Sequence, residues 1–407
     1  MLRAGHTRRQ GNRGAAIVEP QHPDASCSSD LSRRRLWFVV ESGTDVRLVD
    51  GLAERFDLSI VAREIPGGRA ISREHDPRIP TVIGPPSRIR FARVVWRTLT
   101  SSRDPGLVLV QGYGLAAMIT NLAARRIARP TLMLVCSPNE LYYLCRRQDG
   151  DPAKPFRRLE LLGLMALARL NARIARQYIV LSRHLAEVVR GHGTRAPIDV
   201  IPVYGVDITV FRPASESKTV LRQRLGLPDQ GALIFFSSRI APEKDAATLL
   251  KAIRRLLDDG RNVWLLHRSG SYRSLLDMAN HYGVIDRVIA TDAVHPQTHL
   301  AQNYQACDLL VQASREEGLG FSTLESLACE VPVVATAVGG LRETIREGET
   351  GWTYPVGDAA ALARVIAAAL DDPAEATRRA ALGRRMVETE YERRLVFDRL
   401  EALLTAI

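Results

Sequence analysis

Short apolar segments alternate with longer amphipathic segments from residue 36 onward. The short segments are rich in Val, Ile and Leu, as is typical of strands buried on both faces of a sheet. The longer segments repeat apolar residues at the three- and four-residue spacing of a helix. Strands are expected at 36–40, 58–61, 107–110, 131–135 and 178–181, with helices at about 46–52, 115–127 and 156–175. This alternation predicts parallel βαβ units and therefore a doubly wound α/β sheet.

The pattern pauses over about 204–230, where Pro213, Gly226 and Pro228 interrupt it, and then repeats. The second series has strands at 233–236, 263–266, 288–289, 309–311 and 331–336, and helices at 246–258, 273–282, 298–306, 322–329, 341–346 and 359–370. Ser182 and Asp358 each precede a predicted helix and are expected to cap it. Two α/β domains joined by a short linker predict a cleft between them, which is a common place for a ligand.

The first 33 residues lack this pattern and are rich in Arg, Gly, Ser and Gln, so we expect a disordered tail. The tail differs from a secretory signal because no apolar segment follows its arginines. No segment reaches the roughly 18 consecutive apolar residues that predict a membrane-spanning helix. The five cysteines are few, odd in number and without CxxC spacing, which indicates buried thiols in a reducing compartment and hence a cytoplasmic protein.

The basic charge of the chain does not by itself predict a partner. The sequence has 56 Lys and Arg against 45 Asp and Glu, a formal net charge of +11. Only four of the basic residues are lysines, a skew typical of codon bias, and the charge is spread along the chain. No zinc-finger or RNP-like motif accompanies it, so nucleic-acid binding is not expected.

Several motifs associated with cofactors, metals or nucleophiles are incomplete. The segment Gly112-Tyr113-Gly114-Leu115-Ala116-Ala117 resembles the dinucleotide fingerprint, but no acidic residue ends the next strand, and a tight turn explains the glycines equally well. His295 and His299 have the spacing of a helical metal pair, but the Glu of HExxH is missing, and Pro296 fits a first helical turn. The sequence contains neither a P-loop nor a GxSxG elbow. No metal ligand is therefore assigned.

Two loops of the second series suit a ligand that carries phosphate. Residues 314–325 follow a strand and open a helix, so their glycines and the helix start offer free backbone N–H groups. Arg239 and Lys244 follow the first strand of the same domain at the same sheet edge, and two cations there suit a diphosphate. Structural alternatives exist for both loops. Ser322 and Glu325 have the spacing of a helix capping box, and Lys244 could lie in an exposed turn.

These residues resemble the retaining glycosyltransferases of the GT-B fold, and most of all family four of the sequence-based classification. The motifs that carry the resemblance are Arg239-x-x-Pro-Glu-Lys244, Glu317-Gly-x-Gly with Glu325 after seven intervening residues, Cys329-Glu-Val-Pro-Val-Val-Ala-Thr336, and Gly339-Gly340. The resemblance is strong over about 230–370, moderate at 179–212 and weak before residue 130.

The resemblance implies a particular domain organisation. An acceptor-side Rossmann-like domain would occupy 34–205, and a nucleotide-sugar-binding domain would occupy 206–388, the two facing a cleft. A C-terminal helix at 389–407 would return to the first domain, as it does in the family.

The resemblance also implies roles for the matching residues. Glu325 would accept hydrogen bonds from the ribose hydroxyls of a nucleotide diphosphate sugar, and Glu317 would contact the donor sugar. Arg239 and Lys244 would neutralise the departing diphosphate, which makes Arg239, Lys244 and Glu317 the predicted catalytic residues. The predicted donor-binding residues are Gly43, Gly318, Leu319, Gly320, Phe321 and Glu325. Neither a protein nucleophile nor a metal or other cofactor is implied.

The implied function is transfer of a sugar from a nucleotide diphosphate sugar, with a UDP-sugar favoured, to an acceptor with retention of anomeric configuration. Such a step would serve the biosynthesis of a polysaccharide, a glycolipid or a glycosylated metabolite. The base, the sugar, the oligomeric state and the acceptor (saccharide, lipid-linked or small molecule) stay open. Two other classes also stay open: a non-catalytic nucleotide-sugar-binding partner of another transferase, and a sugar-nucleotide 2-epimerase of related fold.

Three departures from the family pattern concern the donor side. Family members usually place a sugar-contacting His after the strand that here ends at Val135, but this sequence has Cys136. The usual Pro-Asn-Gly-Val-Asp segment lacks its Asn at 202–207 and is one residue longer. The usual glycine-rich turn is replaced at 267–272. These changes leave the donor sugar and the acceptor open and raise the question of low activity.

A basic amphipathic segment at 88–97 interleaves Arg88, Arg90, Arg93 and Arg97 with Ile, Phe, Val and Trp. Such a helix can lie on an anionic bilayer, here the inner face of the cell membrane, which would suit a lipid-linked acceptor. An ordinary surface helix packed against the sheet has the same pattern, so both interpretations stay open.

Overall fold

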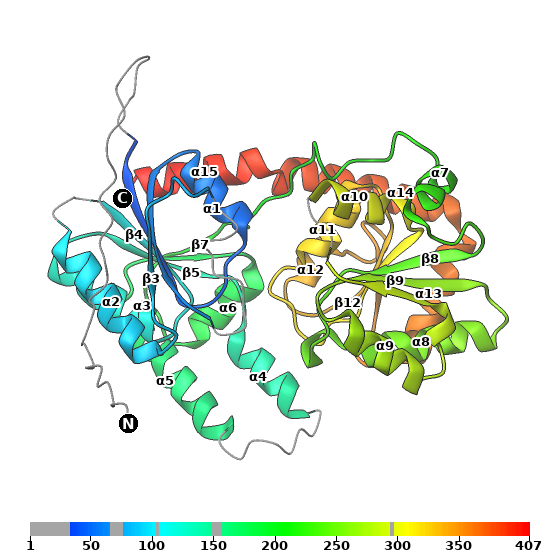
Figure 1. Ribbon diagram of the computed structural model, residues 1–407, viewed down its shortest axis with the longest axis horizontal. Helices are drawn as coiled ribbons and strands as arrows, with labels where there is room; N and C mark the ends of the chain where they lie inside the picture. The colour runs from blue at the N-terminus through cyan, green and yellow to red at the C-terminus, as the bar shows by residue number, and fades with distance from the viewer. Residues whose placement is uncertain (1–32, 66–75, 103–105, 149–156, 294–296) are drawn as a thin grey trace, which may run out of the picture. The chain divides into compact units, whose positions relative to one another are not determined.

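A computed structural model of the chain describes residues 33–65, 76–102, 106–148, 157–293 and 297–407. The predicted disordered tail lies outside these ranges except for Arg33, and so do His295 and Pro296. The chain from Arg34 to Ile407 forms one compact unit, which contains two sheets (Figure 1).

The first sheet has seven parallel strands in the order β3-β2-β1-β4-β5-β6-β7. The strands are β1 (Arg35–Val40), β2 (Asp57–Arg63), β3 (Thr81–Gly84), β4 (Leu107–Gln111), β5 (Thr131–Val135), β6 (Tyr178–Val180) and β7 (Ile198–Val200). The five predicted strands of this half are present, and their side chains are almost all buried. The sequence pattern missed β3 and β7 because these edge strands are short and only partly buried, which weakens the apolar signal.

Helices cover both faces of the first sheet (Figure 1). One face carries α1 (Val46–Ala53) and the C-terminal helix α15 (Arg393–Thr405), and the other carries α2 (Arg88–Ser101), α3 (Leu115–Arg126) and α5 (Arg157–Ile174). Two further helices are α4 (Asn139–Gln148) and α6 (Arg183–Gly191). Gly51 allows α15 to pack closely on α1, because a Cβ there would lie 2.1 Å from Phe397 Cζ.

The second sheet has six parallel strands in the order β10-β9-β8-β11-β12-β13. They are β8 (Ala232–Phe236), β9 (Val263–Arg268), β10 (Val288–Thr291), β11 (Leu309–Gln312), β12 (Val333–Thr336) and β13 (Trp352–Tyr354). On one face lie α8 (Ala246–Asp258), α9 (Tyr272–His281) and α13 (Ala359–Asp371), and on the other α10 (Gln297–Ala306), α11 (Phe321–Ala328), α12 (Leu341–Thr344) and α14 (Pro373–Met386). The sequence pattern missed β13, α14 and α7 (Lys218–Leu225), the last within the segment interpreted as a pause.

The fold class is confirmed as two doubly wound parallel-sheet α/β domains. The two predicted caps are also confirmed, since Ser182 accepts from the N–H of Leu185 and Asp358 accepts from that of Ala361. Helix α15 contacts the first domain, where Arg34 Nη1 donates to the carbonyl of Leu404 at 3.0 Å.

The strand order of each sheet reverses once, between β1 and β4 in the first sheet and between β8 and β11 in the second. Loops that leave the carboxyl ends of such strands diverge and leave a crevice where open α/β sheets bind ligands. Strands β8 and β11 are hydrogen-bonded neighbours, with Phe235 opposite Leu310. The two charged loops predicted to meet a phosphate, after β8 and after β11, are therefore adjacent.

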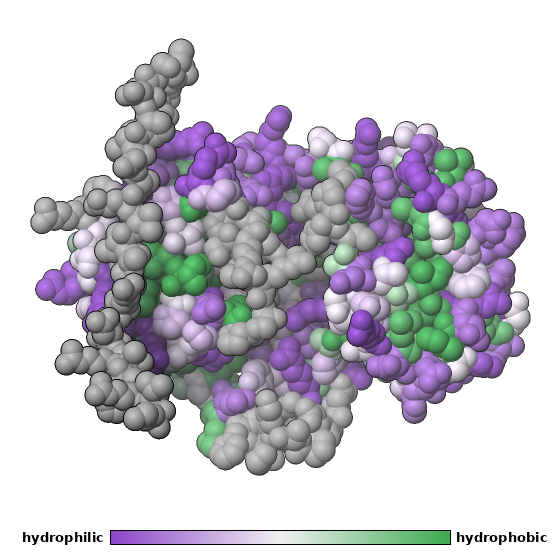
Figure 2. Space-filling model, in the orientation of Figure 1, coloured by the Kyte–Doolittle hydropathy of each residue, from purple (hydrophilic) through white to green (hydrophobic). Residues whose placement is uncertain are grey.

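Hydrophilic side chains cover much of the described surface in the view of Figure 2, and a hydrophobic patch lies near β3. Within the described ranges, no helix has the length and hydrophobicity needed to cross a bilayer.

Candidate functional site

The adjacent loops after β8 and β11 bring Lys244 and Glu317 together. Lys244 ends the short 3₁₀ helix η2 (Pro242–Lys244), and its Nζ forms an ion pair with Glu317 Oε2. The same oxygen accepts from Gln312 Nε2 at 3.1 Å and from Ser314 Oγ at 3.2 Å. The Lys244 and Glu317 side chains are only 11% and 10% exposed, so the exposed-turn alternative for Lys244 is wrong.

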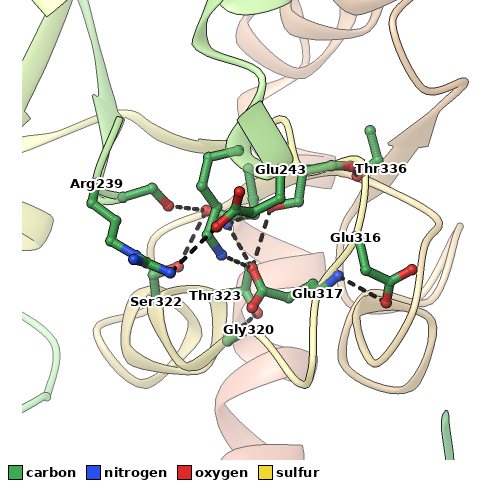
Figure 3. Close-up of polar contacts among 12 residues, drawn as sticks. Arg239, Glu243, Glu316, Glu317, Gly320, Ser322, Thr323 and Thr336 are labelled. Carbon is green, nitrogen blue, oxygen red and sulfur yellow. Dashed lines mark hydrogen bonds and ion pairs between the residues drawn. The ribbon is translucent and has the colours of Figure 1, made fainter. Parts of the chain in front are cut away.

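Arg239 lies in the same loop but extends toward Glu243 (Figure 3). Its Nη2 is 3.3 Å from Glu243 Oε1, and its side chain is 62% exposed. Glu243 is buried and also pairs with Arg146 of α4 at 3.2 Å. Burial alone would raise the pKa of Glu243, but the hydrogen bond from Arg146 and the surrounding positive charge outweigh it and hold that pKa below its usual value. Arg239 is therefore a largely solvated cation in the loop after β8.

Close backbone packing explains the glycines after β11. A Cβ on Gly318 would lie 2.8 Å from the carbonyl oxygen of Cys136, and a Cβ on Gly340 would lie 2.3 Å from that of Gly318. Gly320 has a φ of 91° and is the N-cap of α11. Ser182 Oγ donates to the Gly318 carbonyl at 2.6 Å. The loop therefore packs against residues of both domains.

Glu325 is a buried ion-pair partner and not a helix cap. Helix α11 begins at Phe321, one residue before Ser322, and has no side-chain cap. Ser322 Oγ instead donates to Gln312 Oε1 at 3.2 Å. Glu325 Oε2 accepts from Tyr304 OH and its Oε1 from Arg47 Nη1, each at 2.8 Å. The capping-box alternative is therefore wrong, because the helix starts too early for it.

Arg47 is a site residue that the sequence did not single out. It lies in the first turn of α1, and its Nε and Nη2 bond to Asp45 at 2.9 and 2.6 Å. Its guanidinium carbon lies 5.9 Å from the ring centre of Tyr204 and 5.6 Å from that of Phe321, and these two rings meet edge to face. The only feature of Arg47 visible in the local sequence is its position in the first helical turn after the Gly43 loop. That position does not reveal that Arg47 has a partner in the other domain.

Burial and the neighbouring charges have opposite effects on the pKa values of Glu325 and Arg47. Burial raises the pKa of Glu325, and the opposing effects of Arg47 and Tyr304 do not cancel that rise. Burial would lower the pKa of Arg47, but the carboxylates of Glu325 and Asp45 outweigh burial and raise it. The charge on Glu325 therefore depends on Arg47.

The other predicted donor-binding residues lie at varying distances from these charges. Leu319 is 2% exposed and packs in the core, and Phe321 lies beside Arg47. The Gly43 carbonyl accepts from Gln111 Nε2 at 3.4 Å across the strand-order reversal of the first sheet. Within the described residues, no hydrogen bond joins Gly43 to the loop after β11.

The dinucleotide-like segment is a tight turn. Gly112 has a φ of 89° between β4 and α3, which requires glycine. Glu140 bonds to Tyr113 OH and, through its other oxygen, to His192 Nε2 at 2.7 Å, so it is engaged within the first domain. In the ranges that the structure covers, no three His, Cys, Asp or Glu side chains cluster as metal ligands would.

Two protein-family models match successive parts of the chain. "Glycosyl transferases group 1" matches residues 217–386, and "Glycosyl transferase 4-like domain" matches residues 46–203. HepE from Anabaena, solved in complex with UDP and glucose, superposes with a TM-score of 0.74 at 17% identity, over 92% of this chain and all of that one. Sucrose-phosphate synthase from Thermosynechococcus elongatus superposes with a TM-score of 0.73 at 21% identity, over 92% and 99%. The chain therefore has the GT-B fold, and each half of its sequence matches a glycosyltransferase family model.

Among glycosyltransferases, the chain resembles family four. The D-inositol 3-phosphate glycosyltransferase of Thermobispora bispora is 31% identical over 283 residues, which are 66% of this chain and 64% of that protein. The protein of the same name from Xylanimonas cellulosilytica is 38% identical over 194 residues, 45% of each chain. The alignments span less than two thirds of these relatives' own length.

Cys136 occupies the position where the GT-B resemblance leads us to expect a sugar-contacting His. Burial raises the pKa of its thiol to about 12, so the thiol is uncharged at neutral pH. Its carbonyl oxygen lies against Gly318, as described above. Cys136 therefore contributes close packing here and no charged side chain.

A further contact between the domains is expected to make stability depend on pH. His184 Nε2, at the start of α6, lies 2.7 Å from Glu316 Oε1, and this hydrogen bond raises the pKa of His184 above its ordinary value of 6.5. The contribution to stability is complete below the pKa of the unfolded state and is lost as the pH rises through the raised pKa of the folded state. His184→Gln should therefore lower the free energy of unfolding more at about pH 6 than at about pH 9.

Urea denaturation of the wild type and the variant at both pH values measures this difference. His281→Gln is the matched control, since His281 is an exposed histidine of α9 without a carboxylate partner in the described part of the chain. An equal loss at the two pH values would contradict the prediction.

Proposed function

We propose that the chain transfers a sugar from a nucleotide diphosphate sugar to an acceptor hydroxyl with retention of anomeric configuration. A UDP-sugar is the favoured donor, because UDP is the commonest donor nucleotide of the family that the chain resembles. The observation that carries the proposal is the pairing of Lys244 with Glu317 at the strand-order reversal of the second sheet, with Glu325 on the helix that follows.

The arrangement suits the charges that develop during glycosyl transfer. Negative charge grows on the departing phosphate as the sugar becomes oxocarbenium-like, and preorganised cations stabilise that charge. The Lys244 ammonium would move from Glu317 to the diphosphate, and the exposed Arg239 of the same loop would also contact the diphosphate. Glu317 would then meet the sugar hydroxyls, and Glu325 would accept from the ribose diol.

The relatives suggest first substrates to try. HepE was solved with UDP, and the curated relatives act, by their names, on D-inositol 3-phosphate. We therefore propose UDP-sugars as first donors and a phosphorylated cyclitol as first acceptor, with saccharide and lipid-linked acceptors next. Cys136 is the one observation that favours a non-catalytic nucleotide-sugar-binding partner, because the expected sugar-contacting imidazole is missing.

The proposal predicts distinct effects on binding and on turnover. A nucleoside diphosphate at 100 times its Kd should stabilise the fold by about 2.7 kcal/mol, and thermal denaturation with UDP, GDP and ADP would identify the base.

Lys244→Ala should lower kcat by roughly 100- to 1000-fold and change UDP affinity much less, because the charge on the phosphate is greatest in the transition state.

Turnover of radiolabelled nucleotide sugar, including slow hydrolysis without acceptor, measures kcat. Lys251→Ala is the matched control, since Lys251 lies on α8 with its Nζ 5.6 Å from the ring centre of Tyr282. Nucleotide binding without any turnover would favour the non-catalytic alternative, and NMR of the products would reveal a 2-epimerase.

The proposed chemistry requires no metal. Lys244 and Arg239 would supply the positive charge that a divalent cation supplies elsewhere. We therefore expect turnover to survive EDTA at concentrations that remove Mg²⁺ and Mn²⁺. Loss of turnover that either metal restores would contradict this assignment.

We also propose that α2 and the neighbouring edge strand β3 dock on an anionic membrane. The helix packs Phe91 and Val95 against the sheet, yet Ile89 is 64% and Trp96 is 39% exposed on its outer side. Arg93 lies between these two on the same helical face. Apolar anchors beside arginines are typical of helices that lie in an anionic interface.

Cosedimentation with vesicles that contain anionic lipid tests this surface. Ile89→Gln combined with Trp96→Gln should weaken binding by about tenfold or more, and high salt should weaken wild-type binding. Val220→Gln is the control, because Val220 is an exposed apolar residue of α7 in the second domain (48%). Absent binding at low salt, or binding unchanged by salt, would count against the surface.

A further inference from the structure

Arg47 links the first domain directly to a residue of the proposed donor site. Its Nη1 donates to Glu325 Oε1 at 2.8 Å, and its Nε and Nη2 bond to Asp45. One guanidinium therefore joins a carboxylate of each domain, although Arg47 and Glu325 are 278 positions apart in the sequence.

The orientation of Arg47 is fixed from several sides. Asp45 is the N-cap of α1 and accepts from the Arg47 N–H at 2.9 Å, while Arg393 of α15 donates to the Arg47 carbonyl at 3.0 Å. The rings of Tyr204 and Phe321, which contact each other, both lie against the guanidinium. The Arg47 side chain is only 17% exposed, so little of its charge is screened by water.

Glu325 retains acceptor capacity while it is paired. Arg47 occupies one site on Oε1 and Tyr304 OH occupies one site on Oε2. Each carboxylate oxygen has about two lone-pair sites, so one on each oxygen is left for a second donor. A vicinal diol presents two hydroxyls at a matching separation. Arg47 therefore need not leave Glu325 when a ribose binds.

We propose that Arg47 is a positioning residue for the donor: it orients the Glu325 carboxylate and keeps it negatively charged, so that Glu325 accepts hydrogen bonds from the ribose diol. This inference rests on the proposed function and adds a residue to it. Because Arg47 belongs to the first domain, nucleotide affinity depends on contact between the domains. Arg47 acts through Glu325 and is not itself assigned to the ligand.

The charged and titratable groups around Glu325 determine how affinity changes with pH. Arg47 and Asp45 face it from α1, Tyr304 from α10, and Cys329 from the end of its own helix. Burial and, to a smaller extent, Asp45 favour the neutral acid, and Arg47 is the cation that opposes them. Removing the charge of Arg47 raises the pKa of Glu325 further, so the acid form is populated at higher pH than in the wild type.

Isothermal titration calorimetry of the full chain tests the inference, with whichever of UDP, GDP and ADP the wild type binds most tightly. Arg47→Gln should weaken binding by about tenfold or more at low pH and by less as the pH rises, because Glu325 then ionises even without Arg47. Arg47→Lys keeps the charge but cannot bridge two carboxylates, so binding should weaken by about threefold with the wild-type pH profile.

Arg55→Gln is the matched control. Arg55 lies just beyond α1, is 18% exposed and pairs with Asp398 of α15 at 3.0 Å, so it is as buried and as paired as Arg47, but its partners among the described residues do not include Glu325. It should bind nucleotide as the wild type does. Wild-type affinity of Arg47→Gln, tighter binding, or a loss that is the same at every pH would overturn the inference.

The outcomes separate this inference from the proposed function. Wild-type protein that binds none of the three nucleotides would overturn both, whereas a wild type that binds and an unaffected Arg47→Gln would overturn only the role of Arg47. If Arg47→Gln does not fold, Arg47→Lys decides: weaker binding with the wild-type pH profile supports the role, and wild-type affinity or a loss equal to that of Arg55→Gln overturns it.

Discussion

Two carboxylates buried at the edge of the second sheet require a cation beside each, and much of the candidate site follows from that requirement. An unpaired buried carboxylate would lose its charge or destabilise the fold by several kcal/mol, so burial of Glu317 and Glu325 needs partners in place. Glu317 finds Lys244 within its own domain, and Glu325 finds Arg47 in the other. The two acids of one motif therefore depend on different parts of the chain.

The topology of the sheets supplies those partners. Adjacent strands β8 and β11 carry their loops to the same edge, which places Lys244 against Glu317 without any long side-chain reach. Glycines 318 and 340 then let three backbone segments approach more closely than a Cβ would allow. Charge pairing and close backbone packing thus act on the same loop.

Side chains of the first domain contact the loops at this edge of the second sheet. Arg47 meets Glu325, Arg146 meets Glu243, and Ser182 meets the Gly318 carbonyl. These contacts stabilise charges and backbone groups that belong to the proposed donor site. In the part of the chain that the structure describes, that site is therefore not a property of the second domain alone.

The sequence by itself determined the repeated strand-helix pattern, the two-domain α/β class and the caps Ser182 and Asp358. It also determined the segments that carry Lys244, Glu317 and Glu325. These features are local, since backbone periodicity, capping and glycine turns depend on residues a few positions apart. It missed the edge strands β3, β7 and β13, whose short apolar runs give little periodic signal.

Tertiary structure alone decided which partner each charged residue has. The spacing of Ser322 and Glu325 permits a capping box, but the φ of Gly320 starts α11 one residue earlier and turns Glu325 toward Tyr304 and Arg47. No local pattern could pair Arg47 with Glu325, because only the folded chain brings α1 and α11, and with them residues so distant in sequence, to 2.8 Å. The physical reason is that an ion pair depends on separation in space, which the fold sets, and not on separation along the chain.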